Sequence, residues 1–250
     1  MTIIFYDIPS SAPGSSWSPN TRKARYVLNY KGIPYKTEWV EFSDIESHCK
    51  KLGILPTSTK RAGGGPHYTL PAIHDPSTGA YISESTKIAE YLEKTYPDTP
   101  TVFPHNTIGL QWPFNDAYTS LLTPFWMFIL PATFEKLHPV SQAYYRTTRE
   151  AFFGKKIEEL MPTGDAATKE WANCKEGLGK VSVWFEKTDS SGPYLLGDRV
   201  SWGDFVVASY LVWMRIIWGE DSKEWKDISS WDGGRWKRLV ESLKEYETVV

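Results

Sequence analysis

The sequence predicts an α/β domain followed by an all-helical domain, and three observations support this fold class. Strand-like segments, in which apolar and polar residues alternate, occur only within residues 1–96. The next stretch, 97–105, is punctuated by prolines and lacks periodicity, as expected of a linker. Across residues 106–250, apolar residues recur with the helical period and no strand pattern is present. We therefore expect one domain at 1–96 and a second at 106–250.

The first domain is predicted to contain four strands and three helices. Its strands are expected at residues 2–6, 34–40, 68–73 and 80–82, and its helices at 21–31, 43–52 and 86–96. A glycine-rich stretch precedes the third strand. Pro71 lies inside that strand, where a proline is tolerated only at an edge or a bend. A cis peptide bond between Leu70 and Pro71 would explain its position, because a cis bond turns the backbone sharply.

The second domain is predicted to be helical throughout, with helices at residues 106–137, 139–161, 165–188, 201–218 and 231–246. Prolines inside the first of these helices predict kinks or breaks in it. Ser201 and Asp204 form a capping-box pattern at the start of the fourth helix. That helix is the most apolar segment of the chain, but Ser209 and Arg215 interrupt it and it is too short to span a bilayer.

The turn before the first helix carries the residues best suited to hold an anion. Ser18 precedes Pro19 at the predicted helix start, where unpaired N–H groups and the positive end of the helix stabilise a thiolate or another anion. Capping of the helix by Ser18 is the alternative, and it is the more common role for a Ser-Pro pair. Asn20 offers a second donor, and the hydroxyls of Ser16 and Thr21 are reserves.

The chain resembles the cytosolic glutathione transferases over its whole length. The resemblance rests on the βαβ, αββα order of the first domain and on the segment 194–204 of the second, with its capping box, in the order found in that family. Within the superfamily, the chain is most similar to the fungal FuA class and to bacterial β-etherase-like enzymes, at residues 17–22, 25–32 and 39–41 and at the glycine-rich insertion before Leu70-Pro71. The resemblance implies a thioredoxin-like domain with a mixed four-stranded sheet, an all-α domain, glutathione as co-substrate and a homodimer.

The same resemblance assigns roles to residues of the first domain. In the family, the residue at Ser18 faces the glutathione sulfur, and the residue before the cis-proline pairs with the cysteinyl backbone. An acidic residue and a serine, here Glu84 and Ser85, hold the γ-glutamyl end. These correspondences predict a glutathione site that also includes Leu70 and Pro71.

A cation is expected to hold the glycyl carboxylate of glutathione, and the sequence leaves its identity open. Lys60 is our first choice, and Arg61, His67 and His48 are the alternatives. Lys60 and Arg61 also fit a simple solvated loop.

Aromatic residues are frequent, with 12 Trp, 14 Tyr and 11 Phe, and several crowd the first helix of the second domain. Most aromatic residues at helical spacing pack in a core. The resemblance nevertheless implies that this helix looks across a cleft at the sulfur. We therefore expect an aromatic-lined substrate site formed by Trp112, Tyr118, Phe125 and Trp126, with Trp17 as its other wall.

These inferences predict a glutathione transferase that joins glutathione to aromatic or otherwise hydrophobic electrophiles, with Ser18 and Asn20 stabilising the thiolate. A serine in place of cysteine at position 18 argues against thiol reductase activity, because no mixed disulfide can form there. A ligandin-type carrier of aromatic or polyphenolic compounds, with little turnover, is the main alternative. A non-catalytic interaction module built on the same fold is a third hypothesis.

Composition excludes other classes. The net charge is −2 and no basic stripe is present, which argues against nucleic acid as a partner. Cys49 and Cys174 lie far apart, and the five histidines show no ligand spacing, so we expect reduced thiols and no metal site. The chain opens directly into a strand rather than a leader, so we expect a cytoplasmic protein without a membrane partner.

Overall fold

A computed structural model describes residues 2–59, 64–188 and 192–250 of the chain. By their contacts, the residues group into two compact units, and the first of them is assembled from three segments, Met1–Thr101, Lys136–Gly154 and Tyr246–Val250. The second unit comprises Val102–Glu135 and Lys155–Glu245. Grouping by contact therefore does not follow chain order, and the domain limits 1–96, 97–105 and 106–250 stay a prediction.

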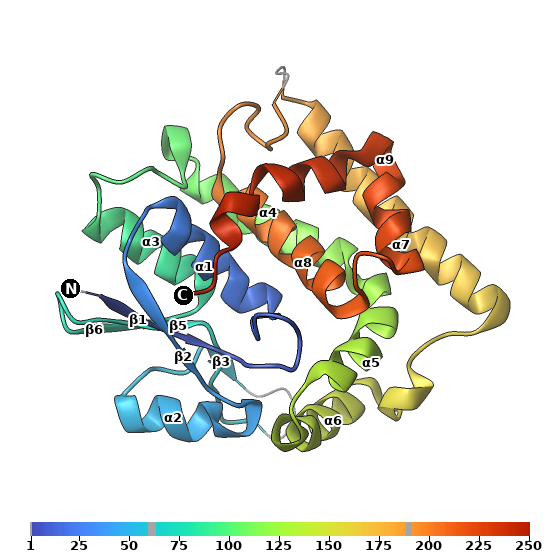
Figure 1. The fold of residues 1–250 in the computed structure, drawn as a ribbon, viewed down its shortest axis with the longest axis horizontal. Helices are drawn as coiled ribbons and strands as arrows, with labels where there is room; N and C mark the ends of the chain where they lie inside the picture. Colours follow the sequence, from blue (N-terminus) through green and yellow to red (C-terminus); the bar gives the residue numbers. More distant parts are fainter. Residues whose placement is uncertain (1, 60–63, 189–191) are drawn as a thin grey trace. The chain divides into compact units, whose positions relative to one another are not determined.

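The first unit contains a mixed four-stranded sheet in the order β2-β1-β5-β6 (Figure 1). Its strands are β1 (Ile3–Asp7), β2 (Tyr35–Trp39), β5 (Ala72–Asp75) and β6 (Ala80–Ser83). β1 and β2 are parallel, whereas β5 is antiparallel to both of its neighbours. A separate two-stranded ladder joins β3 (Ser58–Thr59) to β4 (Pro66–His67). The mixed four-stranded sheet expected from the sequence is confirmed.

Helices cover both faces of this sheet. Neighbouring strand residues point to opposite faces, and the consecutive residues Phe5 and Tyr6 of β1 are both buried. The elements are α1 (Pro19–Tyr30), the short 3₁₀ helix η1 (Phe42–Asp44), α2 (Ile45–Leu52) and α3 (Ser85–Thr95). On one face, the Phe5 ring lies against the Arg25 guanidinium of α1, and α1 contacts α3. On the other face, Tyr6 contacts His48 of α2, with ring centroids 5.0 Å apart.

Two distant parts of the chain complete the first unit. Helix α6 (Pro139–Phe153) packs against η1, although the two are separated by about a hundred residues in the sequence. The last residues bind α1 and β2, since Asn29 Nδ2 donates to the Thr248 carbonyl at 2.9 Å and Thr37 N donates to the Val250 carbonyl at 3.0 Å. These contacts join residues that are far apart in the sequence, so local sequence patterns could not reveal them.

The second unit is helical, as expected, apart from two isolated β-bridges among its described residues. Its helices are α4 (Ile108–Leu121), α5 (Trp126–Lys136), α7 (Gly164–Glu186), α8 (Trp202–Trp218) and α9 (Lys223–Ser242), with short 3₁₀ turns η2 (Pro104–Asn106), η3 (Thr123–Phe125), η4 (Ile157–Glu159) and η5 (Lys244–Glu247). The predicted helix 106–137 is broken at η3, where Pro124 lacks an N–H. Within the described residues, no helix combines the length and the apolar character that crossing a bilayer requires.

The end of the chain differs most from the predicted helix limits. Helix α9 begins at Lys223, whereas the sequence pattern placed its start at residue 231. Asp232, Gly233 and Gly234 all have positive φ, at 51°, 65° and 78°. These left-handed residues kink α9, so the predicted start marks an internal kink instead of a helix terminus.

Helix α8 forms the centre of the second unit and confirms the predicted capping box. Ser201 and Asp204 are fully buried. The Asp204 carboxylate accepts hydrogen bonds from Leu195 N at 2.7 Å, Ser201 N at 2.8 Å and Ser201 Oγ at 2.9 Å. These bonds pair the N–H of the N-cap residue Ser201 and the N–H of Leu195 in the preceding loop, next to a helix that is buried almost throughout, where an unpaired N–H is costly.

Candidate functional site

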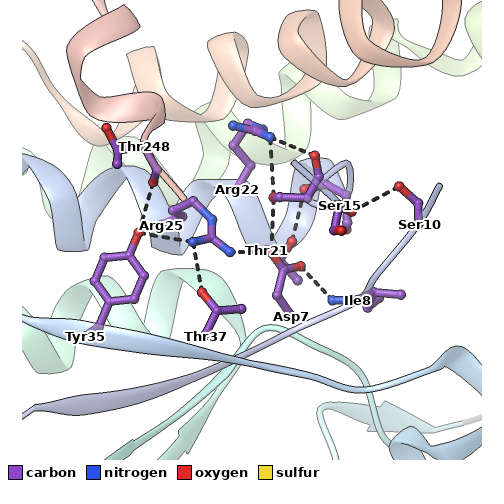
Figure 2. Close-up of polar contacts among 12 residues, drawn as sticks. Asp7, Ile8, Ser10, Ser15, Thr21, Arg22, Arg25, Tyr35, Thr37 and Thr248 are labelled. Carbon is purple, nitrogen blue, oxygen red and sulfur yellow. Dashed lines mark hydrogen bonds and ion pairs between the residues drawn. The ribbon is translucent and has the colours of Figure 1, made fainter. Parts of the chain in front are cut away.

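A buried ion pair supports the turn between β1 and α1 (Figure 2). Arg25 Nη2 lies 2.7 Å from Asp7 Oδ2, and both side chains have no exposed surface. The other Asp7 oxygen accepts a hydrogen bond from Ile8 N at 2.7 Å, at the first residue of the turn. Arg25 also donates through Nη1 to the Tyr35 hydroxyl and to Thr37 Oγ1, both at 3.1 Å. The start of the turn is thereby tied to the sheet and to α1.

The end of the same turn is tied down by a second buried arginine. Arg22 Nη2 donates to the Ser16 carbonyl at 3.1 Å, and Ser16 Oγ donates to Asp7 Oδ2 at 3.1 Å. Burial lowers the pKa of Arg22, but a guanidinium stays protonated at physiological pH. Ser16, two residues before Ser18, is therefore held by both Arg22 and Asp7.

Ser18 is the N-cap residue of α1, yet its side chain makes no capping hydrogen bond. Its φ and ψ are −63° and 126°, and Pro19 occupies the first turn of the helix, as predicted. The Ser18 carbonyl accepts from Arg22 N at 3.0 Å and from Thr21 Oγ1 at 3.2 Å. Capping by the Ser18 hydroxyl, the common role of a Ser-Pro pair, is therefore absent here.

The two reserve hydroxyls have other partners. Ser16 Oγ donates a hydrogen bond to Asp7 Oδ2, and Thr21 Oγ1 donates one to the Ser18 carbonyl. A hydroxyl carries one proton, so neither group can donate to a ligand while these bonds persist. Asn20 is exposed at the start of α1. Of the donors proposed from the sequence, Ser18 and Asn20 are the two that these contacts leave for an anion.

The peptide bond between Leu70 and Pro71 is cis, which confirms the prediction made from a proline within a strand. Leu70 is buried, with 4% of its surface exposed. The Pro71 carbonyl accepts a hydrogen bond from Glu84 N at 3.2 Å. The bend before β5 is therefore joined directly to the start of α3, and the structure brings together Pro71 and Glu84 as the sequence suggested.

Glu84 has a strained backbone, with φ of 80° and ψ of 128°. Its carboxylate caps α3, accepting from Thr86 N at 3.0 Å and Lys87 N at 3.1 Å, and Ser85 Oγ donates to it at 3.1 Å. Such a conformation in a residue other than glycine costs about 1–3 kcal/mol and is often found at functional sites. The cap is one structural reason for the acidic residue, a role that the sequence analysis did not consider.

Of the four residues proposed to hold the glycyl carboxylate, the structure describes only the two histidines. Lys60 and Arg61 lie outside the described residues. His67 Nδ1 is 3.2 Å from Ser58 Oγ, across the β3–β4 ladder. His48 Nε2 is buried and has no hydrogen-bond partner among the described residues. The residue that holds a glycyl carboxylate is therefore not identified by these contacts.

The four aromatic residues proposed for the substrate belong to the second unit and differ in exposure. Tyr118 and Phe125 are fully buried, and burial raises the pKa of Tyr118. Trp112 is 39% exposed. Trp126 is half-buried, and its ring lies 5.7 Å from that of Trp213. The two tryptophans retain surface for a ligand, and substrate binding by all four residues stays a prediction.

A group of aromatic residues in the first unit was missed by the sequence analysis. Trp17, which is 4% exposed, lies against Phe42 of η1, with ring centroids 5.9 Å apart. Phe42 also contacts Tyr144 at 6.0 Å and Tyr145 at 5.8 Å, both on α6. The separation of η1 from α6 hides this group in the sequence. Its one local signal is Tyr145 and Arg149, four residues apart on one helix face.

The cysteines do not contribute to the site. Cys49 and Cys174 are both buried and form no disulfide. Burial raises the pKa of the Cys49 thiol to about 11 and also raises that of Cys174. Thiols with raised pKa values are poor nucleophiles, as expected for structural cysteines. No group of residues able to hold a metal ion is present in the described part of the chain.

A mixed sheet with a cis-proline, followed by a helical unit with a buried capping box, defines the fold of the glutathione transferases. The glutathione S-transferase N-terminal domain family matches residues 17–95, and the C-terminal domain family matches residues 109–246. The chain belongs to the glutathione S-transferase family.

Its relatives include fungal proteins of the FuA class, which confirms the resemblance at class level. A glutathione S-transferase of Ceriporiopsis subvermispora, crystallised with glutathione, is 44% identical, with a TM-score of 0.93 over 100% of this chain and 99% of that one. Glutathione transferase GSTFuA3 of Phanerochaete chrysosporium is 41% identical, with the same TM-score and coverage. The glutathione S-transferase-like protein ustS of Aspergillus flavus is 30% identical over 94% of this chain and 87% of its own length.

Proposed function

We propose that the protein binds glutathione and transfers it to aromatic or otherwise hydrophobic electrophiles. The observation that carries this proposal is the hydroxyl of Ser18, which lies at the start of α1 and is not used to cap it. Family membership and the glutathione complex of the relative from Ceriporiopsis subvermispora support glutathione as the co-substrate.

The proposed roles follow from the contacts of each residue. The Ser18 hydroxyl donates to the sulfur of glutathione, and exposed Asn20 supplies a second donor. Leu70 and Pro71 present backbone groups to the cysteinyl residue. Glu84 and Ser85 bind the γ-glutamyl end, and their rigid position at the start of α3 supports this role. Trp17 and Lys60 complete the proposed glutathione site, and Trp112, Tyr118, Phe125 and Trp126 are proposed to bind the electrophile.

The chemistry depends on the pKa of the glutathione thiol. A free cysteine thiol has a pKa of about 8.5, so it is largely protonated at neutral pH. A hydroxyl donor and the positive end of α1 favour the thiolate. The thiolate sulfur then forms a bond to an electrophilic carbon. In a substitution, the bond from that carbon to a halide or aryloxide breaks, and the leaving group departs with the bonding electrons.

Replacement of Ser18 by alanine tests this role. We expect Ser18→Ala to lower kcat/KM for conjugation of 1-chloro-2,4-dinitrobenzene about ten-fold, or about 1.4 kcal/mol of transition-state stabilisation. Glutathione affinity, measured by calorimetry, should change little. Asn20→Ala is the matched comparison. Full activity in Ser18→Ala would move the role to Asn20 or to the backbone, and no heat on titration of glutathione into the native protein would refute the proposal.

A carrier of aromatic ligands is the second proposed function, and the exposed surface of Trp112 and Trp126 favours it. A carrier would show quenched tryptophan emission when aromatic ligands bind, but negligible conjugation. A cytoplasmic homodimer is likewise proposed from the family. Light scattering during gel filtration would show twice the chain mass if the dimer forms.

A further inference from the structure

The aromatic group on η1 and α6 is a series of ring contacts that begins at Trp17, beside the proposed reactive turn. Trp17 directly precedes Ser18 and contacts Phe42. Phe42 is nearly parallel to Tyr144, with an interplanar angle of 21°, and meets Tyr145 edge-on. We call Phe42, Tyr144, Tyr145 and Arg149 the α6 platform. All of it lies within the first compact unit, together with Ser18.

The members of the α6 platform divide into support and surface. Tyr145 is 1% exposed and lies beneath the group, as does Trp17 at 4%. Tyr144 is 36% exposed, and Phe42 is half-buried. Two rings thus retain surface while two others support them. Flat aromatic molecules pack well on such surfaces, because offset stacking and edge-to-face contacts are favourable.

Arg149 gives the α6 platform a positive charge that pairs with no carboxylate among the described residues. Its guanidinium carbon lies 4.4 Å from the Tyr145 ring centroid and 5.9 Å from that of Phe42. Its Nη1 donates to Thr148 Oγ1 at 3.1 Å, and no ion pair joins it to any described residue. Arg146, one turn earlier, instead pairs with Glu150 at 2.9 Å. A guanidinium has five N–H donors, so Arg149 retains several for an anion.

The α6 platform is held firmly in place. Ser141 Oγ accepts a hydrogen bond from Phe42 N at 2.9 Å and donates to Glu41 Oε2. Glu41 Oε1 lies 2.7 Å from His138 Nδ1 at the start of α6. The acidic residue beside Phe42 is therefore already occupied, and it fixes α6 against η1. Binding a ligand to a preformed surface costs less free energy than binding it to a surface that must first become ordered.

We propose that the α6 platform is a further acceptor subsite, besides the four aromatic residues proposed in the second unit, for aromatic electrophiles that carry an anionic group, such as a carboxylate or a sulfonate. The aromatic ring lies on Phe42 and Tyr144, and the anion pairs with Arg149 through charge-assisted hydrogen bonds. The proposal rests on the proposed transferase function and specifies its substrate class. Arg149 acts as a specificity-determining residue and takes no part in bond making.

Two related electrophiles test the proposal in the full-length protein. 1-Chloro-2,4-dinitrobenzene is neutral, and 4-chloro-3,5-dinitrobenzoate carries a carboxylate. In both, the thiolate sulfur bonds to the ring carbon, the carbon–chlorine bond breaks and chloride leaves, while the thiol proton passes to solvent. The ratio of kcat/KM for the benzoate to kcat/KM for the neutral substrate isolates recognition of the anion from the chemistry.

We expect Arg149→Met to lower that ratio about ten-fold, mainly through KM for the benzoate, and Arg149→Lys to restore part of it. Arg146→Met is the matched control, because it removes the same charge from α6, and it should leave the ratio unchanged. Phe42→Ala should raise KM for both substrates. An unchanged ratio in Arg149→Met overturns the subsite while the transferase function stands. If the native protein converts neither of the two substrates, the transferase function is overturned and the subsite with it.

Discussion

Ser18 and Ser201 occupy the same position, the N-cap, at the starts of α1 and α8, but their surroundings differ. Ser201 has Asp204 three residues later, and the two residues form a closed capping box. Ser18 has Thr21 at that position, and its hydroxyl caps nothing. Ser201 is thus part of a closed capping box, whereas the Ser18 hydroxyl makes no capping bond at α1.

The two helix starts also differ in how they satisfy backbone groups. At α8, the Asp204 carboxylate accepts a hydrogen bond from the backbone N–H of the N-cap residue, Ser201. At α1, Pro19 removes one N–H, and the turn is held from below by Asp7, Arg25 and Arg22. Stability in the second case comes from a network that joins α1, through its own Arg22 and Arg25, to Asp7 and to the turn. A ligand at the start of α1 can then use the helix terminus without displacing a cap.

The largest expected effect is loss of that supporting network. Asp7→Ala leaves the Arg25 guanidinium buried without its partner, so we expect the free energy of unfolding to fall by about 3–5 kcal/mol. Urea denaturation followed by tryptophan fluorescence measures it. Asp116→Ala, at an exposed position on α4, is the control and should change stability little. A loss below about 1 kcal/mol for Asp7→Ala would show that the ion pair does not support the turn.

The pH dependence of stability should single out the capping box. Burial raises the pKa of Asp204 to about 7, although its hydrogen-bond donors oppose this shift. Its pKa in the unfolded chain is about 3.9, so between these values the folded state binds more protons than the unfolded state. Stability contributed by Asp204 is therefore greatest at low pH and is lost as pH rises from about 4 to about 7, at up to about 1.4 kcal/mol per unit.

Asp204→Asn removes this titration while keeping a side chain of similar size. Urea denaturation at pH 5 and pH 7 should show a smaller loss of stability with rising pH in the variant than in the native protein. Equal losses in both proteins would mean that Asp204 is ionised across this range, with its hydrogen bonds outweighing its burial.

The smallest effect compares the two serines directly. We expect Ser201→Ala to lower the free energy of unfolding by about 1 kcal/mol, because it removes a capping side chain. Ser18→Ala should change stability by less than about 0.5 kcal/mol, since no capping bond is lost. The same urea titrations measure both variants. An equal cost for the two would contradict the difference in capping on which the proposed role of Ser18 depends.

Local patterns predicted much of the fold and part of the candidate site. Pro71 within a strand indicated the cis bond, and Ser201 with Asp204 indicated the capping box. Both depend on residues within three positions of each other. The positive φ residues that kink α9 were not anticipated, because Asp232 and the two glycines after it also fit a helix start.

Contacts between residues far apart in the chain could not be predicted from the sequence. Ser18 and Asn20 rank above Ser16 and Thr21 as donors in the sequence, but only the contacts in the folded protein show that Ser16 and Thr21 donate to other groups. The α6 platform was not predicted at all, since Phe42 N and Ser141 Oγ are 99 residues apart in the chain. Helical periodicity shows that α6 is a helix, but it does not show which surface the helix contacts.

The sequence by itself determined the order of the main strands and helices, the family and the starts of α1 and α8, because each is encoded in short segments whose backbone preferences are local. Only the tertiary structure decided which hydroxyls near the first helix already donate to other described residues, and that α6 joins the unit containing Ser18. The physical reason is that a side chain's proton and its packing partner are shared with residues far away in the chain, and folding settles which of them meet.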